Sequence, residues 1–536
     1  VDDRALHEIY LPAFKAAVHE GQAWAIMGSY NKYKGEHCCH NQYLLNDLLK
    51  RDWGFDGVVV SDWGGVHDTK EAIFNGLDME FGSWTNGLNW GQSNAYDNYY
   101  LAHPYLNLIK KGEVTEKELN DKVRRILRLV FRTNMAKERH FGSFGTEEHA
   151  LAGRTIAQQG IVLLQNKKNV LPVDASKVKR VLVVGENAVK RMTVGGGSSS
   201  LKAKYEVSPL EGIKARLGDG AEVIYSPGYA SPAVKEQDVL GAEEPDKMEI
   251  DADALRNDAV KWAKDADVVF FVGGLNKNDG QDCEGNDRSS LSLPYEQDQL
   301  IAELAKANPN TVVVIISGNA VAMPWVKQVP AIVEAWYSGT EAGNALASIL
   351  FGDVNPSGKL PFTFPARLED NGAHALGEHP GDSINVKYNE SIFVGYRWAD
   401  KQKKTKPLFA FGHGLSYTTF AYGKATATKK SLTADETITF TVPVKNTGSR
   451  EGSEVVQLYI GDKKSALPRP IKELKGFSKV KLAPGEEKMV SFTIDKTDLS
   501  YYDDTQNRWV AEPGVFEAFV GASSADIRST VSFELK

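Results

Sequence analysis

The chain has 536 residues, of which 42% are hydrophobic and 25% are charged, and its formal net charge is −7. This length exceeds what one hydrophobic core supports, so we expect about three domains. The composition is that of an ordinary globular protein, and the small negative charge argues against nucleic acid or an anionic membrane as a partner.

The sequence begins at Val1 without a methionine or a signal-like segment. We therefore expect its natural N-terminus to lie upstream and the protein to be secreted or periplasmic. No apolar run approaches the roughly 18 residues that cross a bilayer. The three cysteines are too few for a disulfide framework, although Cys283 could bond to Cys38 or Cys39.

The first domain is predicted over residues 1–140 and alternates helices with strands. Helical spacing of apolar residues covers 2–17, 43–50, 68–75 and 116–135, and strands are predicted at 23–30, 57–61 and 77–81. This alternation indicates parallel strands joined by helices. A closed eight-stranded barrel needs on the order of 250 residues. The region therefore predicts only the C-terminal part of a TIM-like (β/α) barrel.

Asp62 directly follows the apolar, β-branched segment 58–60, which has the pattern of a strand buried on both faces. Barrels carry their chemistry at the carboxyl ends of such strands, where a carboxylate serves as nucleophile, metal ligand or base. The alternative is that Asp62 caps a helix beginning near Gly64. The adjacent Trp63 favours a sugar site, because the apolar face of a sugar ring packs on an aromatic ring. Packing in the core is the competing role for Trp63.

The second domain, residues 141–365, is predicted as an α/β sandwich. A helix is expected at 147–158, and strands are expected at 160–165, 181–185, 268–273, 311–317 and 332–336. The polar loop 275–288 leaves the carboxyl end of the strand at 268–273, so it would face a cleft between domains. A calcium-binding loop is out of register here. A solvated turn held by pairing of Asp287 with Arg288 is the alternative interpretation.

Two further motifs predict no metal or cofactor. The residues of 37–40, His-Cys-Cys-His, are consecutive and cannot close a tetrahedron around one zinc ion. The segment 195–200, Gly-Gly-Gly-Ser-Ser-Ser, lacks the spacing of either nucleotide-binding fingerprint. We expect this glycine-rich loop to approach a ligand closely instead.

The C-terminal third changes class. Residues 366–415 lack regular periodicity and predict a long surface connector. Residues 416–536 contain alternating segments at 437–444, 453–459, 487–494 and 515–521, separated by turn residues. They predict a β-sandwich of the immunoglobulin or fibronectin kind.

Several motifs, in the same order, resemble family-3 glycoside hydrolases of the β-glucosidase type. They are Met27-Gly28-Ser29-Tyr30-Asn31, Asp52-Trp53-Gly54-Phe55-Asp56-Gly57 with Val60-Ser61-Asp62-Trp63, Glu284-Gly285-Asn286-Asp287-Arg288 with Leu291-Ser292-Leu293-Pro294, Pro356-Ser357-Gly358-Lys359-Leu360-Pro361, and Phe411-Gly412-His413-Gly414-Leu415-Ser416-Tyr417-Thr418. The resemblance covers essentially the whole chain. It implies a partial TIM-like barrel, an α/β sandwich and a C-terminal fibronectin type III-like domain, in agreement with the pattern of predicted elements.

The resemblance also implies a pair of catalytic carboxyl groups. Asp62 would be the nucleophile and Glu284 the general acid/base of a retaining double displacement. Asp62, among polar groups, should stay ionised. Glu284 should hold a proton until the glycosyl-enzyme forms and then act as base toward water.

Other residues would bind the sugar. The resemblance implies that Tyr30 holds the nucleophile, that Met27 and Trp63 line the sugar pocket, and that Ser198 lies in a loop reaching the sugar. The family's Lys-His pair, and its Asp and Arg that bind sugar hydroxyls, would precede Val1. A complete site would thus need a missing N-terminal barrel segment.

The implied function is that of an exo-acting β-glucosidase that hydrolyses terminal non-reducing β-D-glucosyl residues of a β-glucoside or oligosaccharide. A β-xylosidase or another exo-glycosidase of the family is the nearest alternative. A non-catalytic carbohydrate-binding protein is the alternative from another class. The Glu284 motif argues against the N-acetylglucosaminidases of the family. Whether the protein forms a homodimer stays open.

Overall fold

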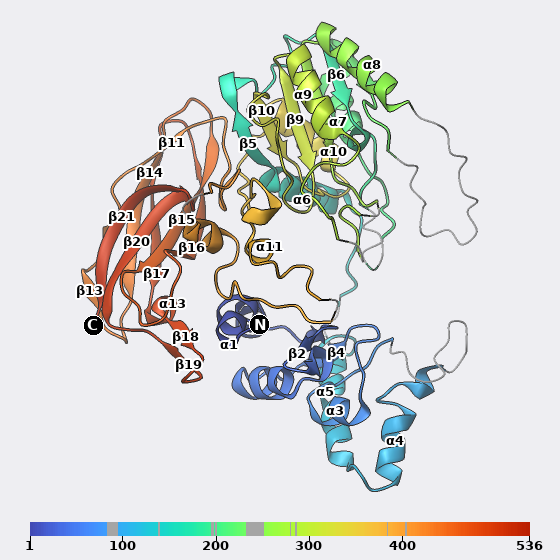
Figure 1. The fold of residues 1–536 in the computed structure, drawn as a ribbon, viewed down its shortest axis with the longest axis vertical. Coiled ribbons are helices and arrows are strands. Elements are labelled where there is room, and N and C mark those ends of the chain that lie inside the picture. Colours follow the sequence, from blue (N-terminus) through green and yellow to red (C-terminus); the bar gives the residue numbers. More distant parts are fainter. Residues whose placement is uncertain are drawn as a thin grey trace. The chain divides into compact units, whose positions relative to one another are not determined.

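The computed structural model describes residues 1–82, 95–137, 140–193, 198, 201–231, 251–278, 280–284, 287–382, 384–402 and 405–536. Tertiary contacts divide the chain into two compact units, Val1–Ser143 (unit 1) and Phe144–Lys536 (unit 2). Figure 1 shows the elements of each unit. Among the described residues, the helices are all too short or too polar to cross a membrane.

Unit 1 is built from short strands and the helices that follow them. Its elements are α1 (Asp3–Ala5), a π-helical turn (Leu6–Tyr10), α2 (Pro12–His19), β1 (Ala25–Gly28), β2 (Lys32–Tyr33), β3 (Glu36–His37), a π-helical segment (Tyr43–Asp52), β4 (Val58–Ser61), α3 (Thr69–Phe74), α4 (His103–Lys110) and α5 (Glu116–Arg132). Strands β1 and β4 pair in parallel. The strand predicted at 77–81 is wrong, since only Met79 forms a parallel bridge, to Val60.

Strand β4 is the centre of unit 1. Val58 and Val59 are fully buried, as their unbroken apolar pattern predicts. Val59 packs in one apolar cluster with Leu45 and Leu49 of the π-helical segment and with Leu77 beyond α3. This packing fixes the strand from which Asp62 emerges.

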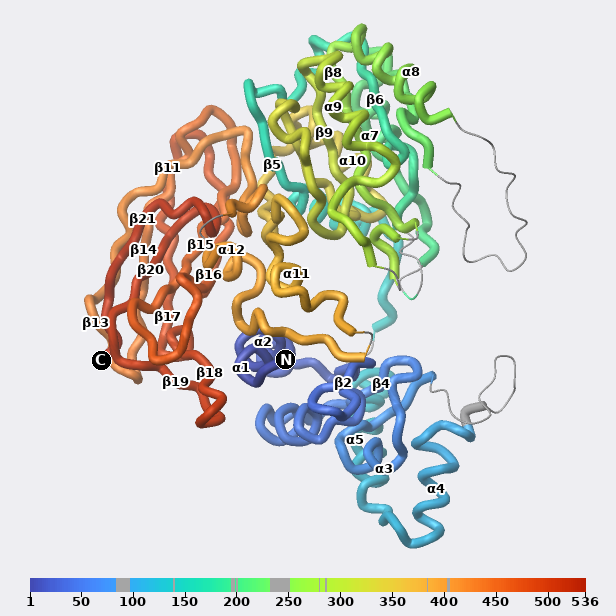
Figure 2. Tube along the Cα trace, viewed as in Figure 1, coloured from blue at the N-terminus to red at the C-terminus, as the bar shows by residue number. Residues whose placement is uncertain are grey.

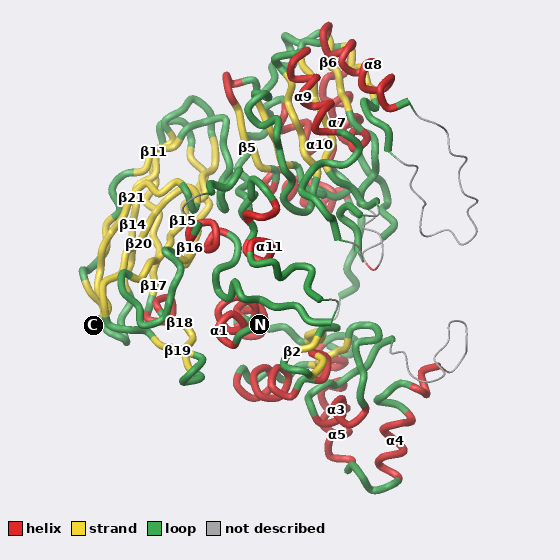
Figure 3. Tube along the Cα trace, viewed as in Figure 1, coloured by secondary structure: helices red, strands yellow, loops and turns green. Residues whose placement is uncertain are grey.

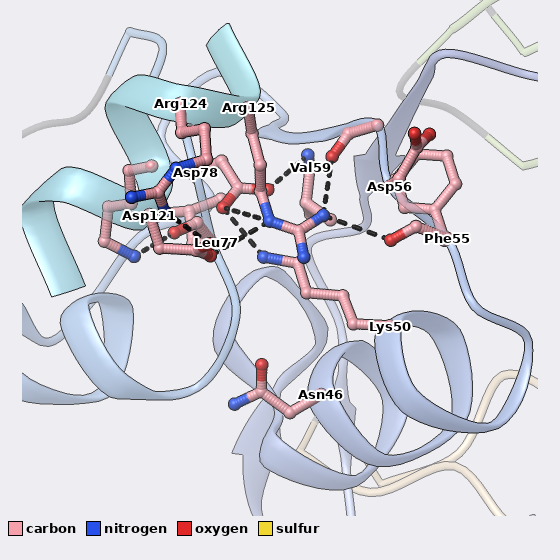
Figure 4. A network of polar contacts seen from close by, with 12 residues as sticks. Asn46, Lys50, Phe55, Asp56, Val59, Leu77, Asp78, Asp121, Arg124 and Arg125 are labelled. Carbon is pink, nitrogen blue, oxygen red and sulfur yellow. Dashed lines mark hydrogen bonds and ion pairs between the residues drawn. The ribbon is translucent and has the colours of Figure 1, made fainter. Parts of the chain in front are cut away.

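A buried ionic network contacts the backbone of β4 and of the residues just before it (Figure 4). Asp78 accepts a hydrogen bond from the Val59 amide at 2.8 Å and pairs with the Lys50 ammonium at 2.7 Å. Arg125 of α5 donates to the carbonyl oxygens of Phe55 and Gly57 at 3.1 and 3.0 Å. Burial lowers the pKa of Lys50, although Asp78 opposes the shift. The network therefore ties α5 and the π-helical segment to the entry of β4.

We expect Asp78→Asn to destabilise unit 1 by about 3–5 kcal/mol, because it leaves the buried Lys50 ammonium without its counter-charge. The matched control is Asp52→Asn, which removes the exposed pair between Asp52 and Arg51 and should cost about 0–1 kcal/mol. Hydrogen exchange of peptides covering 43–61 in increasing urea measures both changes. Equal effects of the two variants would contradict a stabilising role for the buried network.

The N-terminal part of unit 2 is a three-layer α/β sandwich. Its sheet has the order β5-β10-β9-β8-β6-β7, in which β5 is antiparallel to β10 and the other strands are parallel. Figure 1 shows helices on both faces. The elements are α6 (Glu147–Gly160), β5 (Val162–Asn166), β6 (Arg180–Val184), α7 (Pro209–Leu217), β7 (Glu222–Ser226), α8 (Ala252–Asp265), β8 (Val268–Gly274), α9 (Gln297–Ala307), β9 (Thr311–Ile316), β10 (Ala331–Glu334) and α10 (Ala342–Leu350).

Each face of this sheet has its own apolar core. Helices α6, α7 and α10 cover one face, and α8 and α9 cover the other. All residues of β8, β9 and β10 are buried, which is why these strands are mainly apolar, although β10 ends in the buried Glu334. Because β8, β9 and β10 are parallel neighbours, the loops that follow them meet at one edge of the sheet.

Residues 366–415 are more than the predicted surface connector. They contain α11 (Gly372–Ala375) and α12 (Tyr396–Lys401), and they bury Ile392, Trp398 and Phe409. Apolar side chains along the segment, rather than a regular period, fix it to its neighbours, so periodicity could not reveal its packing.

Two of the recognised motifs serve this region structurally. Leu360 and His413 pair through the Leu360 amide and the His413 carbonyl oxygen at 2.8 Å, and Lys359 donates to the Gly414 carbonyl oxygen at 2.8 Å. Lys359 also pairs at 2.9 Å with Glu454, which lies in the segment 452–462 of the C-terminal sandwich. These motifs join the α/β sandwich to the last domain.

The last domain is a β-sandwich, whose yellow strands are joined by green loops in Figure 3 and which is orange to red in Figure 2. One sheet has the order β11-β14-β12 with β17 paired to β14, and the other has the order β13-β21-β20-β15-β16. The strands are β11 (Phe420–Tyr422), β12 (Thr426–Ala427), β13 (Ser431–Leu432), β14 (Ile438–Asn446), β15 (Gly452–Asp462), β16 (Glu473–Leu482), β17 (Glu487–Ile494), β20 (Gly514–Ser523) and β21 (Asp526–Leu535), with helix α13 (Lys496–Leu499) and the hairpin β18 (Tyr501–Asp503) and β19 (Arg508–Val510) between them. Alternate residues of β14 face the core, as predicted.

Candidate active site

Asp62 stands at the carboxyl end of β4 and is held by two hydrogen bonds. Its Oδ1 accepts from the Tyr30 hydroxyl at 2.8 Å and from the Trp63 amide at 2.7 Å. The interpretation of Asp62 as a helix cap is wrong, because α3 begins at Thr69 and Asp68 caps it by accepting from the Glu71 amide. Asp62 is therefore an oriented carboxylate at a strand end.

Three side chains around Asp62 are exposed within unit 1. Met27, Tyr30 and Trp63 are 52%, 53% and 61% exposed, respectively, although two of them are large aromatic residues. Trp63 stacks on Phe81, with ring centroids 5.2 Å apart, rather than entering the core. An exposed aromatic surface beside a carboxylate is a suitable platform for the apolar face of a sugar.

Cys39 supports the turn that carries Asp62. A Cβ atom on Gly28 would lie 2.7 Å from the Cys39 Cα, and a Cβ atom on Gly65 would lie 2.6 Å from its sulfur. Only glycine fits at these two close approaches. Burial raises the pKa of the Cys39 thiol, so it remains a neutral packing group.

The histidines of segment 37–40, for which the sequence predicts no zinc site, contact other side chains of the protein. His40 Nδ1 lies 2.8 Å from Glu71, and His37 stacks on His67 with centroids 3.8 Å apart. Cys38, Cys39 and Cys283 are free thiols in the structure, and because Cys283 belongs to the other unit, the disulfide hypothesis stays a prediction. Among the described residues, no group of His, Cys, Asp and Glu is arranged to hold a metal ion.

Glu284 lies in unit 2, in the loop that follows β8, and its carboxylate is exposed there. Its Oε2 accepts a hydrogen bond from the Ser198 amide at 2.5 Å. Ser198 thus contacts the predicted acid/base through its backbone. The rest of the glycine-rich motif, apart from Ser198, lies outside the described residues.

The loop around Glu284 is not a turn held by pairing of Asp287 with Arg288. Arg288 Nη2 instead donates to the Ala320 carbonyl oxygen at 2.7 Å and to Asn319 Oδ1. Burial lowers the pKa of the Arg288 guanidinium. This side chain therefore anchors the end of the loop to the segment after β9.

Asp282, two residues before Glu284, forms a second anchor. Its Oδ2 accepts from the Gly318 amide at 2.6 Å and from the Tyr337 hydroxyl at 2.8 Å, and its Oδ1 accepts from the Asn319 amide group at 2.7 Å. Sequence reasoning assigned no role to Asp282, Asn319 or Tyr337. Their position after β8, β9 and β10 was the available signal, because parallel neighbours end at one edge.

The site residues therefore fall into two groups, each held within its own unit. Unit 1 brings together Met27, Tyr30, Asp62 and Trp63, and unit 2 brings together Ser198 and Glu284. The meeting of the two carboxyl groups stays a prediction.

Comparisons with known proteins identify the family. Residues 1–129 match the glycosyl hydrolase family 3 N-terminal domain, residues 161–417 match the glycosyl hydrolase family 3 C-terminal domain, and residues 454–524 match a fibronectin type III-like domain. The predicted fold class, a multidomain α/β protein with a fibronectin type III-like C-terminal domain, is confirmed.

Similar proteins extend over the full chain. A β-glucosidase of Bacteroides ovatus is 53% identical over an alignment of 543 positions, which covers 100% of this chain and 71% of that protein. The thermostable β-glucosidase B of Acetivibrio thermocellus is 39% identical over 98% of this chain and 65% of its own length, so the chain spans less than two thirds of that relative. The crystal structure of a Kluyveromyces marxianus β-glucosidase in complex with glucose has a TM-score of 0.86 at 30% identity, covering 100% of this chain and 80% of that one. From these domain matches and from the identity to full-length relatives, we conclude that the chain belongs to glycosyl hydrolase family 3.

Proposed function

We propose that this chain acts as a retaining, exo-acting β-glucosidase that releases terminal non-reducing β-D-glucosyl residues from β-glucosides or oligosaccharides. The observation that carries the proposal is the Asp62 carboxylate at the end of β4, held at 2.8 Å by Tyr30 and at 2.7 Å by the Trp63 amide. The 53% identity to the Bacteroides ovatus β-glucosidase supports it.

In the first step, Asp62 attacks the anomeric carbon and the glycosidic bond breaks. The hydrogen bonds from Tyr30 and from the Trp63 amide both reach Oδ1 of Asp62, so we assign the attack to Oδ2. Glu284 gives its proton to the departing glycosidic oxygen, and a glycosyl ester on Asp62 results. The Tyr30 and Trp63 donors orient the carboxylate before the substrate arrives.

In the second step, Glu284 takes a proton from water, and the resulting hydroxide attacks the anomeric carbon. The bond to Asp62 breaks, and glucose leaves with its β configuration retained. Double displacement requires the two carboxyl groups about 5–5.5 Å apart. Trp63 and Met27 would contact the bound sugar ring, and the Ser198 amide contacts the Glu284 carboxylate.

Tyr30→Phe tests the role of the hydroxyl that contacts the nucleophile. We expect kcat/KM to fall roughly 10- to 100-fold, since a hydrogen bond to a charged group contributes about 1.5–3 kcal/mol and each 1.4 kcal/mol is about tenfold in rate. Tyr43→Phe is the matched control, because the Tyr43 hydroxyl contacts His7 at 2.9 Å away from Asp62. Initial rates with an aryl β-glucoside measure both. Equal losses of kcat/KM in the two variants would contradict a role for the Tyr30 hydroxyl in the site.

The choice of sugar is tested with a panel of aryl glycosides. A β-glucosidase should prefer the glucoside over the xyloside, because the xyloside lacks the hydroxymethyl group that a glucose site contacts. A preference for the xyloside would establish the β-xylosidase alternative. If a protein that includes the proposed upstream barrel segment turns over no glycoside while it still binds glucose, it is a carbohydrate-binding protein.

We further propose that the sugar hydroxyls are bound in part by a barrel segment upstream of Val1. Within the described residues, β1 has only β4 as its paired strand, so its other edge can accept a further strand. Full glucosidase turnover by a chain whose intact mass is only 58.9 kDa would contradict this proposal. Secretion or a periplasmic location, and a homodimer, also stay proposals, and sedimentation of the purified protein tests the latter.

A further inference from the structure

One side chain contacts the loop that carries Glu284 on both sides of that residue. Asn319 lies three residues after the end of β9, at the sheet edge where the loop after β8 also begins. Its amide group donates to Asp282 Oδ1 at 2.7 Å, and its Oδ1 accepts from Arg288 Nη2. Asp282 stands two residues before Glu284, and Arg288 stands four residues after it. Asn319 therefore closes the base of the loop.

On the N-terminal side of Glu284, three hydrogen bonds are donated to the carboxylate of Asp282. Asp282 accepts from the Gly318 amide, the Asn319 amide group and the Tyr337 hydroxyl at 2.6, 2.7 and 2.8 Å. Burial, and then the charge of Asp282, raise the pKa of Tyr337, so this hydroxyl remains a donor. The Asp282 side chain is thus fixed from the segments that follow both β9 and β10.

On the C-terminal side of Glu284, Arg288 contacts the same segment that follows β9. Arg288 donates to Asn319 and, at 2.7 Å, to the Ala320 carbonyl oxygen. The planar guanidinium of Arg288 and the side-chain amide of Asn319 each hold the other group in one orientation. Asp282, Arg288, Asn319 and Tyr337 also line a cavity of about 350 Å³ beside the loop.

We propose that Asn319 is a positioning residue for Glu284, which acts by joining Asp282 to Arg288 and so fixing the direction of the acid/base carboxyl group. The inference rests on the proposed role of Glu284. General acid catalysis requires the proton donor within hydrogen-bond reach of the leaving oxygen, and a small displacement costs much of its effect. Asn319 itself needs no contact with the substrate for this role.

The test compares aryl β-glucosides with poor and good leaving groups in the full chain. Asn319→Ala should lower kcat/KM for a phenyl glucoside roughly 10- to 100-fold, because a misplaced acid no longer protonates the phenolate. It should change the 2,4-dinitrophenyl glucoside less than about threefold, since that leaving group departs without a proton. Asn319→Asp keeps an acceptor for Arg288 but places a carboxylate against Asp282, so it should show the same pattern with unchanged volume.

The matched control is Asn310→Ala. Asn310 precedes the same strand β9 at its opposite end, where its amide group donates to the Asp267 carbonyl oxygen at 3.0 Å. It should change neither substrate by more than about twofold. Thermal unfolding of each variant separates loss of folding from loss of positioning.

The outcomes are distinguishable. Equal losses of Asn319→Ala on both substrates would overturn the inference and indicate contact with the sugar, and an unchanged phenyl glucoside rate would overturn it as well. Glu284→Ala is measured in the same assay. If Glu284→Ala itself shows no dependence on the leaving group, the proposed function fails; if only Glu284→Ala shows it, the role of Asn319 fails and the proposed function stands.

Discussion

Asp62→Asn should lower kcat by about 10⁴-fold or more, because a carboxamide does not attack the anomeric carbon and no covalent intermediate forms. The amide keeps the size of the side chain and still accepts from the Tyr30 hydroxyl. We therefore expect the fold and the affinity for glucose to persist. Steady-state rates with an aryl β-glucoside, together with glucose binding by calorimetry, measure the two expectations.

The control for Asp62→Asn lies in the same loop. Asp68→Asn replaces the cap of α3 by a residue that caps equally well, so its activity should stay within about twofold of the unmodified protein. A 2-deoxy-2-fluoro-glucoside adds a direct readout, because the glycosyl ester accumulates when the second step is slowed. Mass spectrometry should find the label on Asp62, and a label on any other carboxylate would reject the assignment.

Glu284→Ala should have an effect that depends on the leaving group. For glucosides with poor leaving groups, kcat/KM should fall by about 10²–10⁴-fold, the usual contribution of general acid catalysis. For a 2,4-dinitrophenyl glucoside the first step should remain fast, and the second step should slow, since water has lost its base. Azide, which needs no base, should restore turnover and give a β-glucosyl azide.

Glu303→Ala is the control for Glu284→Ala. Glu303 lies on α9, where it accepts from Gln299 at 2.9 Å, and it has no role in the proposed reaction. Its loss should change neither class of substrate by more than about twofold. If Glu284→Ala lowered both classes equally and azide gave no product, another residue would be the acid/base.

Local patterns predicted the most apolar buried strands but missed several strands of the C-terminal sandwich, including β16 and β21. Strands β4, β8 and β9 are rich in valine and other apolar residues and lie where the sequence predicts them. Strand β16 was not predicted, because it is an edge strand with several lysines and an exposed face. The antiparallel pairing of β5 with β10 also has no local signal, since it depends on which strand the chain meets later.

By itself, the sequence determined the class of each buried segment, the carboxylates at the strand ends and the family. These depend on residues within a few positions of one another or on motifs that need no structure. Only the tertiary structure decided that Trp63 lies on the surface, that Asp68 rather than Asp62 caps α3, and that Asp282 and Arg288 meet at Asn319. Asn319 meets Asp282 and Arg288 because the order of strands in the sheet brings together side chains separated by many positions. The cap of α3 is a local contact, and its assignment depends on where that helix begins.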